Sequence, residues 1–492
     1  MLLFALDVHV RRLFFWKRCL ITVVPVIRHR FGGKGLSTIE TINRVIAILF
    51  YVCYVYQLFY VPIAWLKKDK PHKSEKRNRI AVLIAARNEQ PVIGNLIESI
   101  HNQDYPSELI DVFVCADNCT DGTAKIAGSL GAFVFKRNDK ANIGKGYVLN
   151  YMLKSIMEGE FPAYDAFLVL DADNILKPNY ITEINKVLSD GYEIVTSYRN
   201  SKNYGDDWIS AGYGLWFMRE SKYLNEPRMK LGTSCAVSGT GFIFSSKVLN
   251  RYGGWNFFTL TEDIEFTVCN IVDGKRVGYA SKAELFDEQP TTFTQSYRQR
   301  LRWCRGYYQV AKRYGIKLIK GLFHGSFSCY DMTMQIMPAA VLSALCIILN
   351  LGYALLSFID HLDWIAFCSS LLSTLLSMFG AIFVLGVITT ISEWRHIYCS
   401  TIKKILYMFT FPFFMTTYLP IAIIAMFKNP SWQPIRHNRS MSLEEITNKF
   451  SDKEQKPVGI SVIEHDVDAE RTIADSNETE RSNCDSDFDI TA

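Results

Sequence analysis

Two apolar regions on either side of a long mixed segment constrain this chain more than any other feature of its sequence. Residues 45–66 and 333–427 are dominated by apolar side chains, and a helix needs about 20 such residues to cross the hydrocarbon core of a bilayer. Residues 71–306 mix polar and apolar side chains. The chain has 492 residues, 49% of them hydrophobic, so we expect a membrane region joined to a globular domain.

The N-terminal apolar region predicts one transmembrane helix and the side on which the globular domain lies. Val45–Leu66 is predominantly apolar and is followed at once by a cluster of lysines. Basic residues at the end of a span favour the cytoplasmic side, so we expect the domain in residues 71–306 to be cytoplasmic. Residues 1–44 contain an apolar stretch that lysine and arginine interrupt. This pattern predicts an interfacial segment rather than a cleaved signal peptide.

The C-terminal apolar region, residues 333–427, predicts two clear spans and a third stretch whose form stays open. Thr333–Phe358 and Trp364–Ile391 are each long enough to cross a bilayer. Ile405–Phe427 contains two prolines, so it predicts either a kinked span or a re-entrant hairpin. Residues 307–325, which precede this region, mix apolar and basic side chains and predict an interfacial helix.

Charge is unevenly distributed along the chain. The net charge is +5, and the basic residues cluster beside the apolar regions, which favours contact with lipid headgroups over binding to nucleic acid. Residues 428–492 form a polar tail whose last part is rich in aspartate and glutamate. That composition predicts disorder, and the side of the membrane on which the tail lies stays open. The twelve cysteines are scattered, which fits a reduced cytoplasmic domain.

Residues 71–306 alternate strand and helix patterns. Repeated alternation of this kind predicts an α/β fold in which helices cover a parallel sheet. In such sheets, ligands bind at the carboxyl ends of the strands. The predicted strands are Ile80–Ala86, Asp111–Ala116, Ala132–Phe135 and Ala166–Leu170, and the predicted helices are Pro91–His101, Thr120–Leu130 and Gly146–Met157.

An aspartate pair, Asp171 and Asp173, directly follows the predicted strand Ala166–Leu170. Side chains two residues apart on an extended segment point the same way, so these carboxylates would repel each other without a nearby cation. Mg²⁺ or Mn²⁺ prefers one or two carboxylates together with phosphate oxygens and water, which suits a nucleotide diphosphate. The alternative is a solvated acidic turn that caps a helix.

A second acidic motif, Thr261-Glu262-Asp263, lies far from the first in the sequence. Transfer of a sugar to a hydroxyl needs a base for the hydroxyl proton and separate stabilisation of the departing diphosphate. Asp263 is the candidate base, and Glu262 is the weaker candidate. A helix N-terminus explains the motif equally well, because threonine followed by acidic residues is a common capping pattern.

A third motif contains Gln299, Arg302 and Trp303, within a run of four arginines in residues 298–305. Arginine binds phosphate through paired hydrogen bonds, and a tryptophan ring offers a flat apolar face to a sugar. The arginines could instead bind lipid headgroups, although that interpretation leaves the glutamine and the tryptophan unexplained.

Short polar motifs follow the first two predicted strands, and each is weak by itself. Asn88 and Glu89 follow the strand that ends at Ala86. Asp117 follows the second strand, where an acidic group could bind a base or a ribose. An Asx-rich turn at the start of a helix is the alternative.

Two further features lie close to these motifs in the predicted order. Lys145 follows the third strand and could place an ammonium group near phosphate. Gly239 and Thr240 lie in a glycine-rich turn that allows the backbone to approach a ligand closely. The turn lacks the spacing of a dinucleotide-binding or phosphate-binding loop.

Taken in order, these motifs resemble those of the processive family 2 glycosyltransferases, which include cellulose, hyaluronan and poly-N-acetylglucosamine synthases. The resemblance covers about residues 78–325, and its most specific element is Gln-x-x-Arg-Trp downstream of Thr-Glu-Asp. It implies a GT-A fold, with a Rossmann-like parallel sheet, embedded in an α-helical transmembrane region. It also implies a UDP-sugar donor, Mg²⁺ or Mn²⁺ as cofactor, and inversion at the anomeric carbon.

The resemblance further implies roles for individual residues. Asp263 would deprotonate the acceptor hydroxyl, and Asp171 and Asp173 would hold the metal-bound diphosphate. The implied donor-binding residues are Ala86, Asn88, Glu89, Asp117, Lys145, Asp171 and Arg302, and the implied acceptor-binding residues are Gly239, Thr240, Glu262, Gln299 and Trp303.

The functional expectation from the sequence is a processive transferase that polymerises UDP-glucose into an extracellular or capsular polysaccharide. The product would pass through the protein's own membrane helices. One alternative is the addition of a single sugar to a membrane lipid, and another is a nucleotide-gated transporter or sensor. The expected partners are the UDP-sugar, a growing glycan or lipid acceptor, and the bilayer.

Overall fold

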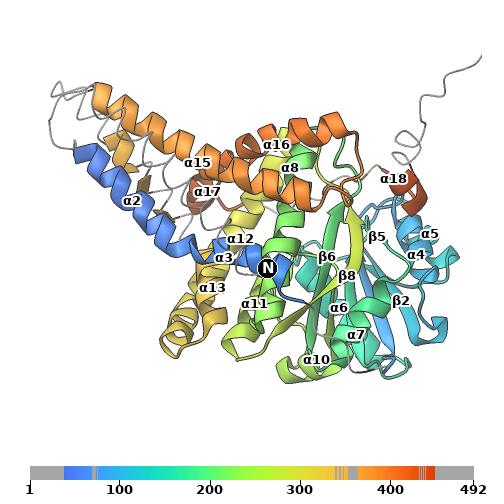
Figure 1. Ribbon diagram of the computed structural model, residues 1–492. Helices are drawn as coiled ribbons and strands as arrows, with labels where there is room; N and C mark the ends of the chain where they lie inside the picture. Colours follow the sequence, from blue (N-terminus) through green and yellow to red (C-terminus); the bar gives the residue numbers. More distant parts are fainter. Residues whose placement is uncertain are drawn as a thin grey trace, which may run out of the picture. The chain divides into compact units, whose positions relative to one another are not determined.

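A mixed eight-stranded sheet forms the centre of the globular domain in the computed structural model (Figure 1). The structure describes residues 38–448 except 69–73, 75, 338–340, 343–344, 347, 353–363, 431–432, 434, 436 and 438. The strand order is β3-β2-β1-β4-β7-β6-β8-β5. The strands are β1 (Ile80–Ala86), β2 (Ile110–Asp117), β3 (Phe133–Arg137), β4 (Ala166–Asp171), β5 (Ile175–Leu176), β6 (Ile194–Ser201), β7 (Phe242–Ser245) and β8 (Val277–Asp287).

The expected parallel sheet is correct for one half of the domain only. β1 pairs in parallel with β2 and β4, and β2 pairs in parallel with β3. In the other half, β7 is antiparallel to both β4 and β6, and β5 is antiparallel to β8. The sheet is therefore mixed, because β7 enters between two strands that run in the opposite direction.

Helices cover both faces of the sheet, and the strand sequences explain why. Alternate residues of β1 point to opposite layers, so Leu83 packs in the layer that contains α6 while Ile84 packs in the layer that contains α4. Strands buried on both faces read as continuous apolar runs, which is how β1 and β4 were recognised. The helices of this part are α4 (Ile93–His101), α5 (Thr123–Ser129), α6 (Lys145–Glu158), α7 (Tyr180–Ser189) and α10 (Ser246–Tyr252).

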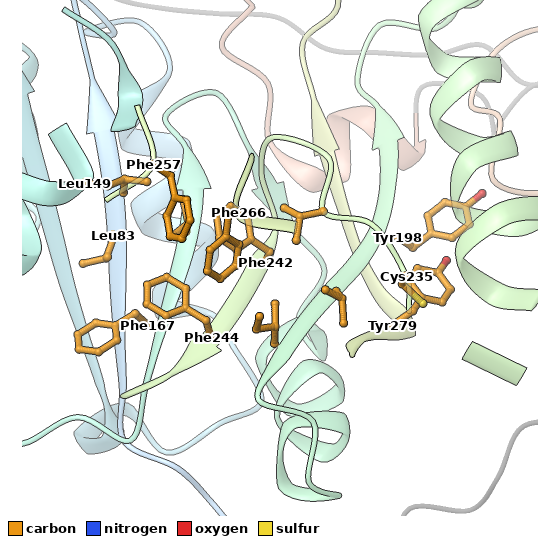
Figure 2. Packing of buried hydrophobic residues seen from close by; sticks show 14 of the residues in the cluster. Leu83, Leu149, Phe167, Tyr198, Cys235, Phe242, Phe244, Phe257, Phe266 and Tyr279 are labelled. Carbon is orange, nitrogen blue, oxygen red and sulfur yellow. The ribbon is translucent and has the colours of Figure 1, made fainter. Parts of the chain in front are cut away.

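An aromatic cluster fixes the helix that carries the second acidic motif. Phe266 lies on α11 (Glu262–Val272) and packs against Phe242 and Phe244 of β7 and against Phe257 (Figure 2). Trp255 completes the cluster, with its ring centroid 5.0 Å from that of Phe266. Because these side chains are fully buried, the first turn of α11 is held at a fixed distance from the sheet.

One long helix leads from the globular domain toward the C-terminal apolar helices. α12 (Phe293–Phe323) runs without a break across residue 306, so the predicted interfacial segment, residues 307–325, and the Gln299–Trp303 motif lie on the same helix. A second continuous helical stretch follows β6. It consists of α8 (Trp208–Glu220), the π-helical turn η2 (Ser221–Asn225) and α9 (Glu226–Leu231).

Three helical stretches are long and apolar enough to cross a bilayer, within the part of the chain that the structure describes: Thr41–Leu66, Leu371–Ser392 and Thr401–Phe427. They overlap the predicted spans Val45–Leu66 and Trp364–Ile391 and the stretch Ile405–Phe427, which was expected to be either a kinked span or a re-entrant hairpin. The predicted span Thr333–Phe358 lies partly outside the described residues, and of the predicted interfacial segment only residues 38–44 are described. The helices are α2 (Thr38–Tyr54), α3 (Tyr56–Leu66), α13 (Phe327–Ile336), α15 (Trp364–Ser392), α16 (Thr401–Thr416) and α17 (Tyr418–Phe427).

The polar segment after α17 is not entirely unstructured, which corrects the prediction for residues 428–492. It contains a short helix, α18 (Leu443–Asn448). Ile446 is buried against Ile175 and Phe286 of the sheet. A few apolar side chains in a polar sequence were enough to anchor this stretch to the globular domain. Residues 451–492, with most of the acidic side chains, lie outside the described residues.

Candidate active site

Three parallel strands bring the first candidate residues to one edge of the sheet. Ala86 at the end of β1 lies opposite Ala116 of β2, and Ala85 lies opposite Asp171 of β4. The turn after β1, the turn that begins at Asp117 and the aspartate pair therefore start at the same edge. The convergence expected for the strand-end motifs is present in the structure.

The turns after β1 and β2 are bound to each other. Asn88 has a φ of 59°, in the left-handed region, and its Oδ1 accepts the backbone N–H of Thr120 at 2.8 Å. The backbone N–H of Glu89 donates to Thr123 Oγ1 at 2.9 Å. These contacts hold the buried carboxylate of Glu89 in place, and burial raises the pKa of that group.

Asp117 lies at the sheet edge but already has partners. Its carboxylate accepts a hydrogen bond from Arg137 Nη1 at 2.6 Å and another from Asn118 Nδ2 at 3.0 Å. Both Asp117 and Arg137 are buried. The charge of Asp117 is therefore balanced within the protein by Arg137.

The aspartate pair lies among positively charged groups. Asp171 Oδ1 accepts a hydrogen bond from Lys145 Nζ at 2.5 Å. Asp173 is buried, and its Oδ2 accepts the backbone N–H of Glu288 at 2.6 Å. Burial alone raises the pKa of Asp173, but the positive charges of His437 and Lys202 outweigh it and hold that pKa below its usual value. Asp173 thus stays ionised.

The chemistry of this pair fits a hard divalent cation. Two carboxylates and a solvent-facing edge match the preference of Mg²⁺ and Mn²⁺ for a few protein oxygens completed by phosphate and water. No group of three or more His, Cys, Asp and Glu side chains in the described ranges is arranged to hold a metal. Asp171 and Asp173 are the residues that would hold the ion, with phosphate oxygens and water completing its coordination.

The glycine-rich turn links this pair to the second acidic motif. Lys145 Nζ donates to the carbonyl oxygen of Gly239 at 2.9 Å as well as to Asp171. Thr240 Oγ1 accepts the backbone N–H of Asp171 at 2.9 Å. Gly239 and Gly241 both have positive φ, 77° and 65°, a conformation that glycine adopts without strain.

The candidate base lies directly beyond this turn. A Cβ placed on Gly239 would lie 4.0 Å from Asp263 Oδ2, so the Asp263 carboxylate and Lys145 face the same glycine. Partial burial raises the pKa of Asp263, although the backbone N–H of Ile264 and the charge of Lys145 oppose the rise. Burial next to Asp263 raises the pKa of Glu262 to about 7. A carboxylate in such surroundings accepts a proton readily, as a general base must.

A helix N-terminus is present at this motif, but the threonine does not act as its cap. α11 begins at Glu262, and the Thr261 side chain makes no capping hydrogen bond. Its Oγ1 is buried without a hydrogen-bond partner among the described residues. The capping interpretation therefore explains where the acidic residues lie but leaves the threonine unexplained.

α12 places the third motif against the second through a close helix contact. Gly306 packs on Thr261 so tightly that an added Cβ would overlap the threonine side chain. Arg302 Nη1 donates to the carbonyl oxygen of Leu260 at 3.2 Å. The positive charge of Arg302 lowers the pKa values of both Glu262 and Asp263, against the larger effect of burial.

The other two residues of the third motif lie on the same helix, toward α8. The Trp303 ring packs edge-on against Tyr213 and Phe217, with centroid distances of 5.7 and 6.2 Å. Gln299 Oε1 is buried without a hydrogen-bond partner among the described residues. A buried acceptor without a hydrogen bond costs free energy. A ligand hydroxyl that donates to Gln299 Oε1 would remove that cost.

Two arginines of the run bind protein rather than lipid headgroups. Arg300 is buried and donates to Thr417 Oγ1 at 2.6 Å and to the Phe414 carbonyl oxygen at 3.2 Å. Arg305 Nε donates to Asn429 Oδ1 at 2.8 Å. The lipid interpretation is wrong for these two, because the α16–α17 junction and the end of α17 occupy the space beside α12.

A second group of charged residues, which the sequence does not predict, lies at the same edge. Arg199, at β6, donates from Nε to Asp287 Oδ2 at 2.6 Å and from Nη1 to the Ser238 carbonyl oxygen at 2.8 Å. Its guanidinium carbon lies 3.6 Å from the centroid of the Phe217 ring. The negative charges of Asp171 and Asp173 are close enough to raise its pKa further. No motif spacing marks these residues, since they come from the mixed half of the sheet.

The segment before α18 also reaches the site. His437 Nδ1 lies 2.9 Å from Glu89 Oε2, and Arg439 pairs with Asp206 at 2.7 Å. Despite burial, which lowers it, the charge of Asp173 raises the pKa of His437 to about 10. A positively charged histidine from the predicted polar tail therefore lies near the aspartate pair. The composition of the tail, which predicted disorder, gives no sign of this contact.

Comparisons with known proteins indicate what the globular domain is similar to. Residues 77–306 match the family described as "Glycosyltransferase like family 2". The chain is 28% identical over 277 residues to a beta-monoglucosyldiacylglycerol synthase of Nostoc sp., covering 54% of this chain and 57% of that protein. It is 24% identical over 269 residues to a poly-beta-1,6-N-acetyl-D-glucosamine synthase of Staphylococcus epidermidis, covering 50% and 60%. It thus spans a little more than half the length of these curated relatives.

Among solved structures, the chain is similar to a mannosyltransferase from Pyrobaculum calidifontis determined with GDP-Man and Mn²⁺. The TM-score is 0.49 at 16% sequence identity, over 78% of this chain and 98% of that one. The family match, together with the sheet and its covering helices, confirms the predicted GT-A fold.

Proposed function

From the family 2 glycosyltransferase domain in residues 77–306, we infer that this chain transfers a single sugar from a UDP-sugar to a hydroxyl group of a membrane lipid. Diacylglycerol is the proposed acceptor and glucose the proposed sugar. The main support is that Lys145 contacts both Asp171 and Gly239, while Asp263 faces the same glycine. The described part of the chain also has three candidate membrane spans.

The comparisons favour the lipid product over the polymer that the sequence predicted. The beta-monoglucosyldiacylglycerol synthase of Nostoc sp. is 28% identical over 54% of this chain, whereas the poly-N-acetylglucosamine synthase of Staphylococcus epidermidis is 24% identical over 50%. The Gln299–Trp303 motif does not decide between the two, because both products need a bound hydroxyl acceptor. The polymer remains the second candidate, supported by the staphylococcal relatives.

In the proposed reaction the Asp263 carboxylate accepts the proton of the lipid hydroxyl as its oxygen attacks the anomeric carbon. The bond from that carbon to the UDP oxygen breaks, UDP leaves with the electron pair, and the configuration inverts. No other reactant is needed for the atoms and charges to balance. Lys145 and Arg302 lie where their positive charges would stabilise the negative charge that develops on the departing diphosphate.

The divalent cation has a defined place in this proposal. Asp171 and Asp173 would hold Mg²⁺ or Mn²⁺, which would supply positive charge to the diphosphate. The remaining proposed donor contacts come from the turns after β1 and β2, with Glu89 and Asp117 toward the nucleoside. Gln299 and Trp303 are proposed to contact the acceptor, because they lie on α12 beyond the base.

We further propose that the second half of α12 lies in the membrane interface on the cytoplasmic side. Ile316 and Phe323 are 73% and 84% exposed, and Lys317 and Lys320 are exposed beside them. Apolar side chains next to basic ones on one helix are typical of interfacial helices. Tryptophan placed at this site by Phe323→Trp should be quenched by brominated lipid, whereas Phe133→Trp, on the distant β3 edge, should not.

Product analysis tests the proposed function. The purified full chain, in nanodiscs that contain diacylglycerol, is incubated with radiolabelled UDP-glucose and Mg²⁺ or Mn²⁺, and the products are separated by size and identified by mass. We expect one glycolipid that carries a single hexose. A ladder of oligosaccharides would overturn the lipid proposal in favour of polymerisation. UDP-N-acetylglucosamine and GDP-mannose in parallel reactions identify the donor.

A further inference from the structure

A buried carboxylate with no assigned role lies behind the glycine-rich turn. Glu220 is the last residue of α8 and is 7% exposed. The π-helical turn Ser221–Asn225 follows at once, and such turns are frequent at functional sites because they alter the direction of neighbouring side chains. Burial raises the pKa of Glu220, although the charges of Arg228 and Arg199 oppose the rise. A glutamate that is costly to ionise here requires an explanation.

The hydrogen bonding of Glu220 points to the turn. Ser238 Oγ donates to Glu220 Oε2 at 3.2 Å. No lysine or arginine of the described residues lies within ion-pair distance of this carboxylate, so its attraction to the nearby arginines acts across a longer separation. Among the described residues, the side-chain hydrogen bond of Glu220 is therefore with Ser238, the first residue of the turn.

A second buried glutamate on the same helical stretch provides the contrast. Glu226 is also 7% exposed, but it pairs with Lys222 at 2.9 Å and with Lys230 at 2.6 Å. Those ion pairs within the helix account for Glu226 fully. They do not reach the candidate active site, so Glu226 has a structural role that Glu220 does not share.

The turn that Glu220 contacts carries interactions in two directions. The carbonyl oxygen of Ser238 accepts a hydrogen bond from Arg199 Nη1, and the carbonyl oxygen of Gly239 accepts one from Lys145 Nζ. The backbone N–H of Gly239 lowers the pKa of Asp263 by hydrogen bonding to its carboxylate. A displacement at Ser238 would therefore move Gly239, whose backbone N–H binds Asp263 and whose carbonyl oxygen binds Lys145.

We propose that Glu220 is a positioning residue for sugar transfer, which holds the Ser238–Gly239 corner and thereby sets the distance between Asp263 and the donor site. The inference rests on the transferase activity of the family 2 domain and not on the identity of the acceptor. Displacements of about 1 Å at a reacting centre reduce rates by up to about 100-fold. The contribution of Glu220 appears in the transfer step rather than in donor binding.

Four variants of the full chain test this role, with UDP release and transfer measured for the UDP-sugar that the wild type uses. Glu220→Ala and Ser238→Ala should each lower kcat roughly tenfold while donor KM stays within about twofold. Glu220→Gln keeps an acceptor for the serine hydroxyl and should retain intermediate activity. The double variant Glu220→Ala/Ser238→Ala should be no slower than the slower single variant, because both changes remove one contact.

Glu226→Gln is the matched control. It should lower the midpoint of thermal unfolding and leave kcat unchanged, which separates loss of stability from loss of positioning. The inference would be overturned if the two losses of kcat multiplied in the double variant. It would also be overturned if the donor KM changed as much as kcat, or if Glu226→Gln lost as much kcat as Glu220→Ala. A wild type that releases UDP without making glycolipid would refute the proposed lipid acceptor instead, and the comparison of variants by UDP release would still decide the role of Glu220.

Discussion

Replacement of Gly306 by alanine tests whether the close contact between α12 and α11 assembles the site. A Cβ at Gly306 would lie 2.5 Å from Thr261 Cγ2 and 2.9 Å from its Cβ, and closer still to its Oγ1. Real Cβ atoms do not approach other atoms this closely, so one helix has to move. Because Thr261 precedes Glu262 and Asp263 directly, a shift of α12 separates Arg302 from both carboxylates.

The expected cost follows from two opposing effects. Overfilling a packed contact costs about 1–3 kcal/mol, whereas replacement of a helical glycine by alanine gains about 1 kcal/mol in helix propensity. The net destabilisation is therefore up to about 2 kcal/mol. Activity should fall much further, by roughly 10- to 100-fold, because small displacements at a reacting centre are amplified in the rate.

A second substitution on the facing residue should restore the site. Thr261→Ala removes Oγ1 and Cγ2, which make the two closest approaches to the added methyl group, and Oγ1 has no hydrogen bond to lose. We expect Gly306→Ala/Thr261→Ala to recover most of the transfer activity and thermal stability that Gly306→Ala loses. Transfer rate and unfolding midpoint are measured for wild type, both single variants and the double variant. Wild-type activity in Gly306→Ala, or a double variant no better than it, would refute the reasoning.

Four further outcomes are expected. Because Glu262 keeps its proton while Asp263 ionises, Glu262→Gln should leave the acidic limb of the pH–rate profile close to its wild-type position; a clearly displaced limb would contradict this. The same variant should lose less stability than wild type as pH rises from about 4.5 to about 7, because the native Glu262 keeps a proton that the unfolded chain releases. Asp331→Asn leaves the buried Arg228 without its charge partner, which should cost about 3–5 kcal/mol of stability in denaturation experiments; a change below 1 kcal/mol would show that the pair is dispensable. Chelation of divalent cations should abolish transfer, and added Mn²⁺ or Mg²⁺ should restore it; full activity in chelator would exclude a metal at the aspartate pair.

One half of the sheet could be predicted from the sequence because its strands are buried on both faces. β1 and β4 read as uninterrupted apolar runs, IAVLIAA and AFLVL, bounded by polar turns. β6 and β8 contain scattered polar residues such as Thr196 and Lys282, and their pairing has a register irregularity. These strands carry no clear periodic pattern, so the antiparallel insertion of β7 between β4 and β6 was not foreseen.

The candidate site was predictable where its residues follow strands or lie in compact motifs. Asp171, Asp263 and Arg302 were identified from their neighbours in sequence, and the structure brings them together around Lys145 and Gly239. Their roles as ligand, base and phosphate partner stay predictions.

Arg199, Glu220 and His437 could not be found in this way. Each belongs to the site only because the fold places a segment distant in sequence at this edge of the sheet. Arg199 lies on β6, Glu220 lies directly before the π-helical turn, and His437 lies in the stretch before α18. A single charged residue in an ordinary sequence context gives no spacing from which such a contact could be inferred.

The central claim is that Asp263 is the base of a sugar transfer whose donor binds at Asp171 and Asp173. The most direct test measures, on one preparation of Asp263→Asn, the affinity for UDP with Mn²⁺ by calorimetry and the rate of transfer in a single turnover. The account predicts UDP affinity within about twofold of wild type and a transfer rate lower by about 100- to 10,000-fold, since general base catalysis contributes that much. Transfer at the wild-type rate would contradict it, and so would a loss of UDP affinity large enough to explain the lower rate.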